Sequence, residues 1–261
     1  MAKIISFANQ KGGVGKSTLC IQMAFYLAEN KDLRVLVIDM DPQGNTSSRL
    51  APKELDENGE TVYLYSGTRS VELFHEKPFK ITAMACPAGM DLIHTPRNDP
   101  QLAEVEELPL DTAANPAKHL AKFAQGYDYV LIDCPPSLGR KLVGALVAST
   151  HVVCPIKLSG FAVDGLEDIL STVTGVQNTE NKGLALVGIV INDMDRSQSN
   201  EKALKQLYDA VPDRMLENRI MHRPPLDTAT SEGVPVWTLN YGHVAAREVK
   251  AVLAEIQNKV G

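Results

Sequence analysis

The stretch Asn9–Thr18, with the sequence NQKGGVGKST, decides the fold of this chain. It follows a short apolar run at Ile4–Ala8 and opens a segment of helical period at 16–29. Glycines let consecutive backbone N–H groups turn inward around a phosphate, and a helix start adds free amides and the positive end of the helix dipole. The stretch therefore predicts a phosphate-binding loop in which Lys16 reaches the β- and γ-phosphates and Ser17 offers its hydroxyl to Mg²⁺.

The loop departs from the usual pattern G-x-x-x-x-G-K-[ST], because Gln10 stands where that pattern has its first glycine. Lys11, inside the loop, is a second unusual residue, which in another setting would be a solvated surface lysine. A glycine-rich turn that happens to precede Lys16 and Ser17 is the alternative interpretation. The preceding strand and the following amphipathic helix supply the context that phosphate binding requires, and this context favours a phosphate site.

The rest of the chain alternates apolar, β-branched runs with longer segments of helical period. Such alternation favours right-handed crossovers and a doubly wound, mostly parallel sheet flanked by helices, in which ligands bind beyond the carboxyl ends of the strands. We therefore expect a single α/β domain over residues 1–261, of the P-loop NTPase class. The remaining strands are expected at Arg34–Asp39, Tyr129–Asp133, His151–Pro155 and Leu184–Asn192, and the remaining helices at 140–148, 163–177, 198–210 and 244–259.

Two of these strands end in an aspartate. Asp39 ends the second strand, with Asp41 two residues later, and Asp133 ends the third. These strand ends put carboxylates beside the phosphate loop, where they can hold Mg²⁺ directly or through water, and Asp39 and Asp41 can share the metal shell and the positioning of water. Capping of turns or helices is the alternative role for each aspartate. Because three elements converge on one edge of the sheet, we favour a metal site and phosphoryl transfer from a nucleotide.

The charge of the chain restricts its partners. A formal net charge of −6 over 261 residues, taken whole, argues against nucleic-acid binding. However, residues 51–60 and 98–111, which we expect to be surface loops or short helices, together hold nine acidic residues and one basic residue. The remaining chain is slightly basic, so a local basic surface is compatible with the composition.

The sequence carries no targeting signal that we identify. No apolar run approaches the roughly 20 residues that span a bilayer, and the N-terminus lacks the features of a signal peptide. The four cysteines form no C-x-x-C pair. A reduced, cytoplasmic protein is the expectation.

These motifs together resemble the deviant Walker A ATPases of the ParA/MinD family, and specifically its ParA/Soj branch. Lys11–Thr18 looks like the phosphate loop of that family, Asp39–Asn45 like its switch I segment, and Asp128–Ser137 like its Walker B and switch II region. The similarity covers nearly the whole chain, although residues 51–85 match poorly. It continues at Gly89–Thr95, Ile191–Arg196 and Ser231–Val236 and in the final helix.

The resemblance implies an ATPase that dimerises around two nucleotides, with ATP or ADP and Mg²⁺ as cofactors. Lys11 would be the signature lysine that reaches the partner subunit's nucleotide, whereas Lys16 would bind phosphates in its own subunit. Asn192 matches the position that recognises adenine. The residues expected at the nucleotide are Lys11, Gly12, Gly13, Val14, Gly15, Lys16, Ser17, Thr18 and Asn192.

The resemblance also assigns roles in the reaction. Ser17 would bind Mg²⁺, and Asp133 would assist the metal site beside Asp39. Asp41 matches the residue that is linked to positioning of the attacking water. Lys11, Lys16, Asp41 and Asp133 are therefore the expected catalytic residues.

Members of the ParA branch bind DNA non-specifically in the ATP state and release it after a ParB-type protein stimulates hydrolysis. The resemblance therefore implies plasmid or chromosome partition, with duplex DNA and a ParB-type protein as partners and a cytoplasmic, nucleoid-associated location. Only ten residues precede Lys11. We therefore expect the short form of the family, without an N-terminal helix-turn-helix.

Candidate DNA contacts must be lysines and arginines, which neutralise phosphates. Glu217–Arg223 resembles a DNA-contacting stretch of relatives, so Arg219 and Arg223 are candidates, and Arg247 and Lys250 lie on the final helix. Pro224 and Pro225 depart from the polar or basic residues often found there. Residues 190–261 hold nine basic and ten acidic residues, so simple solvation of exposed helices is the alternative.

Other functions remain open on the residues alone. A MinD-like ATPase would bind membrane through an amphipathic C-terminal helix, as Ala245–Gly261 could be, although its apolar stripe is more simply a core face. We expect no stable membrane association. An iron–sulphur reductase would use cysteines shared between subunits, for which Cys134 and Cys154 are the candidates. A metabolic phosphoryl-transfer enzyme or ligase and a non-enzymatic scaffold complete the alternatives.

Overall fold

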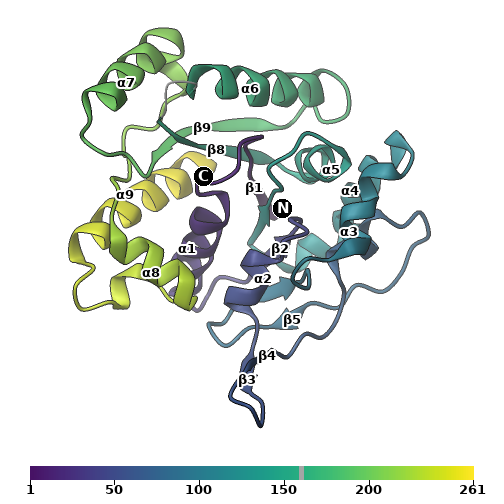
Figure 1. Cartoon of the computed structure of the whole chain (residues 1–261). Helices are drawn as coiled ribbons and strands as arrows, with labels where there is room; N and C mark the ends of the chain where they lie inside the picture. Colours follow the sequence, from purple (N-terminus) through teal and green to yellow (C-terminus); the bar gives the residue numbers. More distant parts are fainter. Residues whose placement is uncertain (159–161) are drawn as a thin grey trace.

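A seven-stranded sheet forms the centre of the structure, a computed structural model that describes residues 1–158 and 162–261 (Figure 1). Its strand order is β5-β6-β2-β7-β1-β8-β9, and all neighbouring strands are parallel except β5 and β6. The predicted doubly wound, mostly parallel sheet is confirmed. Its strands are β1 (Lys3–Phe7), β2 (Val35–Asp39), β5 (Met84–Ala85), β6 (Asp91–Ile93), β7 (Tyr129–Asp133), β8 (His151–Lys157) and β9 (Ala185–Asn192).

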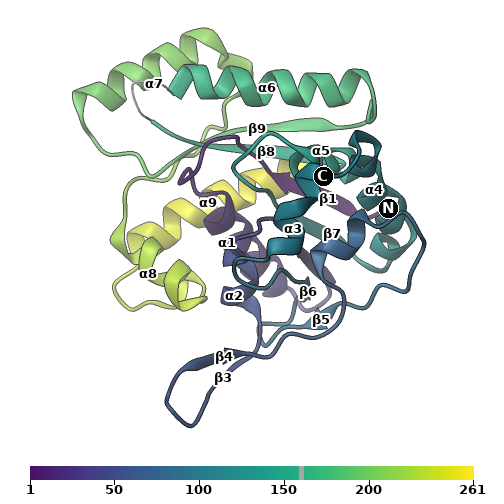
Figure 2. The same cartoon turned by 45° about the vertical axis from the view of Figure 1, so that its right-hand side comes forward.

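Helices cover both faces of this sheet (Figures 1 and 2). One face packs against α1 (Lys16–Ala28), α8 (Pro224–Glu232) and α9 (His243–Val260). The other packs against α4 (Asn115–Phe123), α5 (Arg140–Ala148), α6 (Ala162–Asn178) and α7 (Gln198–Ala210). Two shorter helices, α2 (Asn45–Leu50) and α3 (Pro100–Glu104), lie in the connections.

The sequences of these strands are continuous apolar runs because helices cover both faces of the sheet. In β2, Val35 and Val37 belong to the core on the α1 side, whereas Leu36 and Ile38 belong to the core on the α5 side. Successive side chains of a strand point to opposite faces, so a strand between two helical layers has no polar face. Burial of both faces therefore explains the pattern that predicted these strands.

The parallel strands bring the predicted site residues to one edge of the sheet. Asp39 and Asp133, the last residues of β2 and β7, are register partners. Phe7, at the end of β1, pairs with Asp133, and Asn192 ends β9. The phosphate loop, the aspartates and Asn192 thus start from the same carboxyl edge.

Residues 51–60 are mostly exposed, as expected for a surface segment, but Lys53–Leu55 form a strand that was not expected. The strand β3 (Lys53–Leu55) and the turn that follows pair with β4 (Thr61–Tyr63) as a two-stranded antiparallel hairpin, which projects from the body in Figure 2. Asp56 closes its turn, because its Oδ1 accepts hydrogen bonds from the N–H groups of Asn58 and Glu60 at 2.9 and 2.8 Å. The adjacent Asn58 and Gly59 are a recognised hairpin signal.

The second acidic segment does contain short helices, as expected. Residues 98–111 hold α3, a 3-10 helix at Val105–Glu107 and the start of another at Leu110–Ala114. Two of its acidic residues are nevertheless part of the folded body. Asp99 is buried and Glu106 is half-buried, so this segment is not a purely solvated surface.

Candidate nucleotide site

The phosphate loop joins β1 to α1, as predicted. Gly13 and Gly15 have positive φ angles of 72° and 93°. A Cβ on Gly15 would lie 2.0 Å from Nδ2 of Asn192, so this position requires glycine both for its backbone and for its close neighbour. The loop can therefore approach the end of β9 this closely only because residue 15 is a glycine.

Gln10, the departure from the usual loop pattern, fastens the loop to α6. Its Nε2 donates hydrogen bonds to Oγ1 of Thr172 at 2.8 Å and to the carbonyl oxygen of Asp168 at 3.1 Å. A glycine could not make these contacts. At this position the usual loop has a glycine with a freer backbone, whereas this chain has a side chain that holds the start of the loop.

Lys16 lies inside the loop with only 5% of its surface exposed. Its Nζ donates to the carbonyl oxygen of Lys11 at 2.9 Å. Burial lowers the pKa of Lys16, although the negative charges of Asp133 and Asp41 oppose this shift. A buried ammonium group at this point is suited to phosphate oxygens. Lys11 itself is half-buried, and its N–H donates to Oδ1 of Asn9 at 2.9 Å.

A cavity of about 360 Å³ opens over this loop. Asn192 forms one wall, and its Nδ2 donates to the carbonyl oxygen of Val14 at 3.0 Å. Its Oδ1 is buried without a hydrogen-bond partner. Buried acceptors without partners are rare, so this oxygen is available to accept a hydrogen bond from a bound ligand. Further lining residues are Gly12, Gly13, Gly15, Lys16, Ser17, Thr18, Asp41, Asp193 and Arg223.

Asp133 presents a second acceptor without a partner. Its Oδ2 accepts from Oγ1 of Thr46 at 2.7 Å, whereas its Oδ1 is buried and has no hydrogen-bond partner. Burial raises the pKa of Asp133 to about 6, against the hydrogen bond from Thr46 and the positive charge of Lys16, which lower it. A carboxylate held in a buried position beside a serine hydroxyl is a donor set that suits Mg²⁺.

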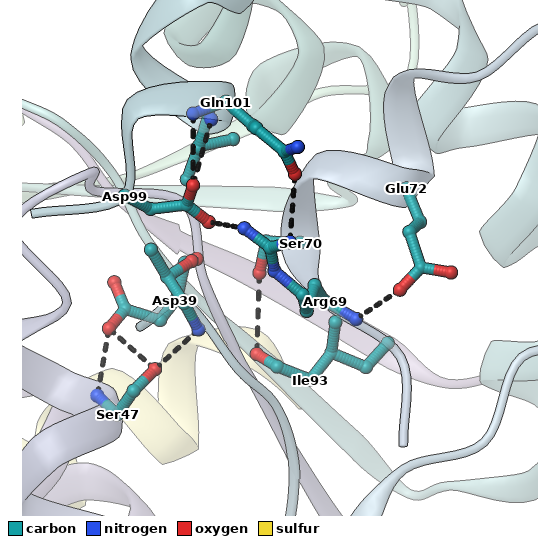
Figure 3. A network of polar contacts seen from close by, with 10 residues as sticks. Asp39, Ser47, Arg69, Ser70, Glu72, Ile93, Asp99 and Gln101 are labelled. Atoms are coloured by element: carbon teal, nitrogen blue, oxygen red, sulfur yellow. Dashed lines mark hydrogen bonds and ion pairs between the residues drawn. The ribbon is translucent and has the colours of Figure 1, made fainter. Parts of the chain in front are cut away.

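Asp39 lies at the end of β2, as predicted, and its carboxylate is held by the segment that follows the strand. It is fully buried, and its Oδ2 accepts from both the N–H and the Oγ of Ser47, at 2.7 and 2.8 Å (Figure 3). Its Oδ1 accepts from the N–H of Asp41 at 3.2 Å, and Asp39 does not line the cavity. These contacts make Asp39 an anchor of the switch I segment, and its contact with Mg²⁺ stays a prediction.

Asp41 does line the cavity, with 8% of its surface exposed. Its Oδ1 accepts from the N–H of Gln43 at 3.0 Å. Burial raises the pKa of Asp41, whereas that hydrogen bond and the positive charges of Lys16 and Lys141 lower it. The carboxyl group is therefore fixed at the cavity wall, close to the cations that favour its ionised form.

The candidate DNA residues lie around α8 and α9, where Arg223 also borders the nucleotide cavity. Arg219 and Arg223 share a hollow of about 670 Å³ with Arg196. Arg223 is bound by Glu248, with Nη2 and Oε1 2.7 Å apart. Pro224 and Pro225 form the first turn of α8, where proline fits because those N–H groups have no helical partner. Sequence alone does not reveal that two of the four candidates, Arg223 and Lys250, form ion pairs within the chain.

The other two candidates lie on α9. Arg247 is exposed. Lys250 is half-buried, with its Nζ 3.4 Å from Oε2 of Glu29 and 4.4 Å from the ring centroid of Trp237. The four residues thus differ in how much of their charge faces solvent.

The apolar face of α9 packs in the core, which removes the observation that favoured a membrane helix. Val249, Val252, Leu253 and Ile256 are fully buried in the layer that covers the sheet. Among residues 1–158 and 162–261, no helix has both the length and the apolar character needed to cross a bilayer. Cys134 and Cys154 are also fully buried, which suits core residues and not ligands shared between subunit surfaces.

Several residues of the site were missed by sequence reasoning. Thr46 and Ser47 hold the two strand-end aspartates, and Asp193 lines the cavity while it binds Lys157 and His222. Asp193 also has a positive φ of 56°, which is uncommon for a residue other than glycine. The serine and threonine a few residues after a strand that ends in aspartate were the available signal for the first pair.

Comparisons with known proteins agree with this geometry. The profile of a family described as an AAA domain matches residues 2–186. The chain is 33% identical over 263 residues to the chromosome-partitioning ATPase Soj of Treponema pallidum, covering 100% of this chain and 99% of that protein.

Solved structures of the same architecture also match. A putative plasmid partition protein of Borrelia burgdorferi bound to AMPPNP has a TM-score of 0.79 at 25% identity, covering 99% of this chain and 100% of that one. A cobyrinic acid a,c-diamide synthase of Mycobacterium smegmatis with bound ADP and magnesium has a TM-score of 0.74 at 26% identity, covering 98% of this chain and 96% of that one.

Proposed function

The chain belongs to the ParA/Soj family of partition ATPases, and we propose that it hydrolyses ATP with Mg²⁺, dimerises in the ATP state and acts in DNA partition. In this proposal it binds duplex DNA non-specifically on the nucleoid in the cytoplasm. A ParB-type protein stimulates hydrolysis, after which the ATPase leaves the DNA. The whole chain acts as one domain in this cycle.

The observation that carries the ATPase proposal is a pair of buried oxygens without partners beside one glycine loop. Oδ1 of Asn192 and Oδ1 of Asp133 are both buried without a hydrogen bond. The first suits the amino group of adenine and the second suits Mg²⁺ or its water shell. The ADP–magnesium complex of the Mycobacterium smegmatis neighbour and the AMPPNP complex of the Borrelia burgdorferi neighbour support this reading.

The residues of the cavity fit the roles that hydrolysis requires. Lys16 and the loop amides would hold the phosphates, and Ser17 and Asp133 would hold Mg²⁺, which supplies Lewis-acid stabilisation of the phosphoryl oxygens when bound. Asp41 would accept a hydrogen bond from the attacking water and fix its direction. The nearby charge of Lys16 favours the ionised Asp41 that this role needs.

Lys11 has a distinct role in the proposal, in which it acts across the dimer. We expect Lys11→Ala to keep most of the nucleotide affinity and to lose ATP-dependent dimerisation or hydrolysis. Nucleotide titration and light scattering of the same variant separate these two effects. Full ATPase activity in both Lys11→Ala and Lys16→Ala would contradict the proposed function.

The proposal is tested by retention on non-specific duplex DNA with ATP and with ADP. We expect retention with ATP only, and the logarithm of the affinity should fall linearly with the logarithm of the salt concentration. Liposomes of anionic lipid are the matched alternative surface. ATP-dependent liposome binding without DNA binding would indicate a MinD-like function instead.

A further inference from the structure

The segment Thr95–Glu107, here called the connecting segment, begins in contact with switch I. The N–H of Thr95 donates to Oγ of Ser47 at 2.8 Å, and the N–H of Asp99 donates to the carbonyl oxygen of Pro42 at 2.8 Å. A Cβ on Gly44 would lie 2.6 Å from the carbonyl oxygen of Thr95. The backbone that follows Asp41 therefore packs directly against the start of this segment.

Asp99 makes the start of the connecting segment rigid. It is 2% exposed, and its Oδ1 caps α3 by accepting from the N–H groups of Gln101 and Leu102 at 3.0 and 3.4 Å. Its Oδ2 accepts from Nη2 of Arg69 at 2.5 Å (Figure 3). A buried carboxylate that is bound on both oxygens holds its backbone in one place.

Glu106, near the other end of the connecting segment, holds the start of α5, just beyond switch II. Its Oε2 accepts from the N–H of Arg140 at 2.6 Å, and its Oε1 accepts from the N–H of Lys141 at 3.4 Å. The first N–H groups of a helix lack helical partners and favour a negative charge. Gly139 precedes the helix and has no side chain to cap it. Glu106 therefore supplies the cap from a distant part of the chain.

Two features show that this contact is built into the protein. A Cβ on Gly139 would lie 2.2 Å from Oε2 of Glu106, and the φ of Gly139 is 175°, an extended value open to any residue. An alanine at this position would therefore displace the carboxylate of Glu106, although the backbone itself would accept it. Lys141 is only 3% exposed, and its Nζ pairs with Oε1 of Glu106 at 2.8 Å. A buried ammonium group needs such a partner.

We infer that Glu106 is a positioning residue that ties the start of α5 to switch I through the connecting segment, so that the two switches change position together. The inference rests on the proposed ATPase function. In this arrangement, a change in switch I at Asp41 moves Pro42 and Asp99, and Glu106 transmits it to Gly139 and α5. Glu106 does not line the cavity and touches no reacting atom.

Steady-state kinetics provide the first test. We expect Glu106→Gln to lower kcat about tenfold while the Kd for ADP stays within about twofold, because Lys16 and the glycine loop are untouched. Glu107→Gln is the matched control, since Glu107 is the neighbouring exposed carboxylate. Equal loss of ADP affinity and kcat, or equal effects of the two variants, would overturn the inference.

Hydrogen exchange tests the coupling itself. In the wild-type protein we expect AMPPNP to protect the amides of both Asp41–Ser47 and Arg140–Val143 more than ADP does. In Glu106→Ala only Asp41–Ser47 should gain this protection, and the amides of Arg140 and Lys141 should exchange faster with either nucleotide. Unchanged exchange at these two amides would contradict the proposed link between Glu106 and the start of α5. Absence of ATP hydrolysis in the wild-type protein would instead overturn the proposed function.

The double variant Glu106→Ala with Gly139→Ala distinguishes the loss of this one contact from a general loss of stability. Gly139→Ala should displace Glu106 and reproduce the kinetic effect of Glu106→Ala. Because the alanine side chain then has room, the double variant should be no worse than either single variant. Fully multiplicative losses of kcat in the double variant would mean that the two residues act separately, and the inference would fail.

Discussion

The nucleotide site differs from the basic surface around α8 and α9, which consists of Arg219, Arg223, Arg247 and Lys250. The difference is whether polar and charged groups find partners within the chain. At the nucleotide site, oxygens of Asn192 and Asp133 are buried without partners. On the basic surface, Arg223 and Lys250 face Glu248 and Glu29. An unpaired buried acceptor costs free energy unless a ligand fills it, whereas a paired surface cation costs little. The nucleotide site therefore gives stronger evidence for the class of its ligand than the basic surface does.

Removal of the buried ammonium group is the strongest test of this difference. We expect Lys16→Ala to weaken ATP and ADP binding by about a thousandfold, because several charge-assisted hydrogen bonds to phosphate are lost. Titration with a fluorescent adenine nucleotide measures the effect. Lys31→Ala, an exposed lysine outside the loop, is the control. Near-normal binding by Lys16→Ala would remove the nucleotide site from this loop.

Asp41 separates binding from chemistry within the same cavity. We expect Asp41→Ala to lower the rate of ATP hydrolysis by about a hundredfold, the usual range for loss of a group that orients or accepts a proton. The variant should still bind ATP and accumulate as the ATP-bound dimer. Phosphate release and light scattering measure the two properties. Rapid turnover in this variant would exclude Asp41 from the reaction.

Asn192 tests whether its unpaired oxygen reads the adenine amino group. Inosine triphosphate lacks that group, so we expect the wild-type protein to bind it about tenfold more weakly than ATP. Asn192→Ala should lose most of this preference, since neither nucleotide then finds the acceptor. Competition titrations with both nucleotides give the ratio. An unchanged preference in the variant would assign adenine recognition to another residue.

The basic surface should respond least, because its charges are partly paired. We expect Glu248→Gln to strengthen ATP-dependent DNA binding about threefold by releasing Arg223, and Arg219→Ala to weaken it by a similar factor. Binding at several salt concentrations measures both changes. Glu232→Gln, which is exposed at the end of α8, controls for net charge. Equal gains in both glutamine variants would show that only net charge matters.

Local patterns in the sequence predicted the fold and the phosphate loop because each depends on neighbouring residues. Apolar runs such as Tyr129–Asp133 are strands covered on both faces, and the glycines of the loop fix its backbone. The hairpin at residues 53–63 was missed, although Asn58 and Gly59 mark its turn. Each of its strands has only three residues, which is too short to show an apolar period.

The sequence by itself therefore determined the α/β fold, the phosphate loop and the placing of Asp39 and Asp133 at strand ends. Only the tertiary structure decided that Asp39 anchors Ser47 while Asp133 keeps an unpaired oxygen. It also decided that Glu106 caps a helix that begins 34 residues later in the chain. Hydrogen bonds and Coulomb energies depend on distances in space, and a one-dimensional pattern does not contain those distances for residues that folding brings together.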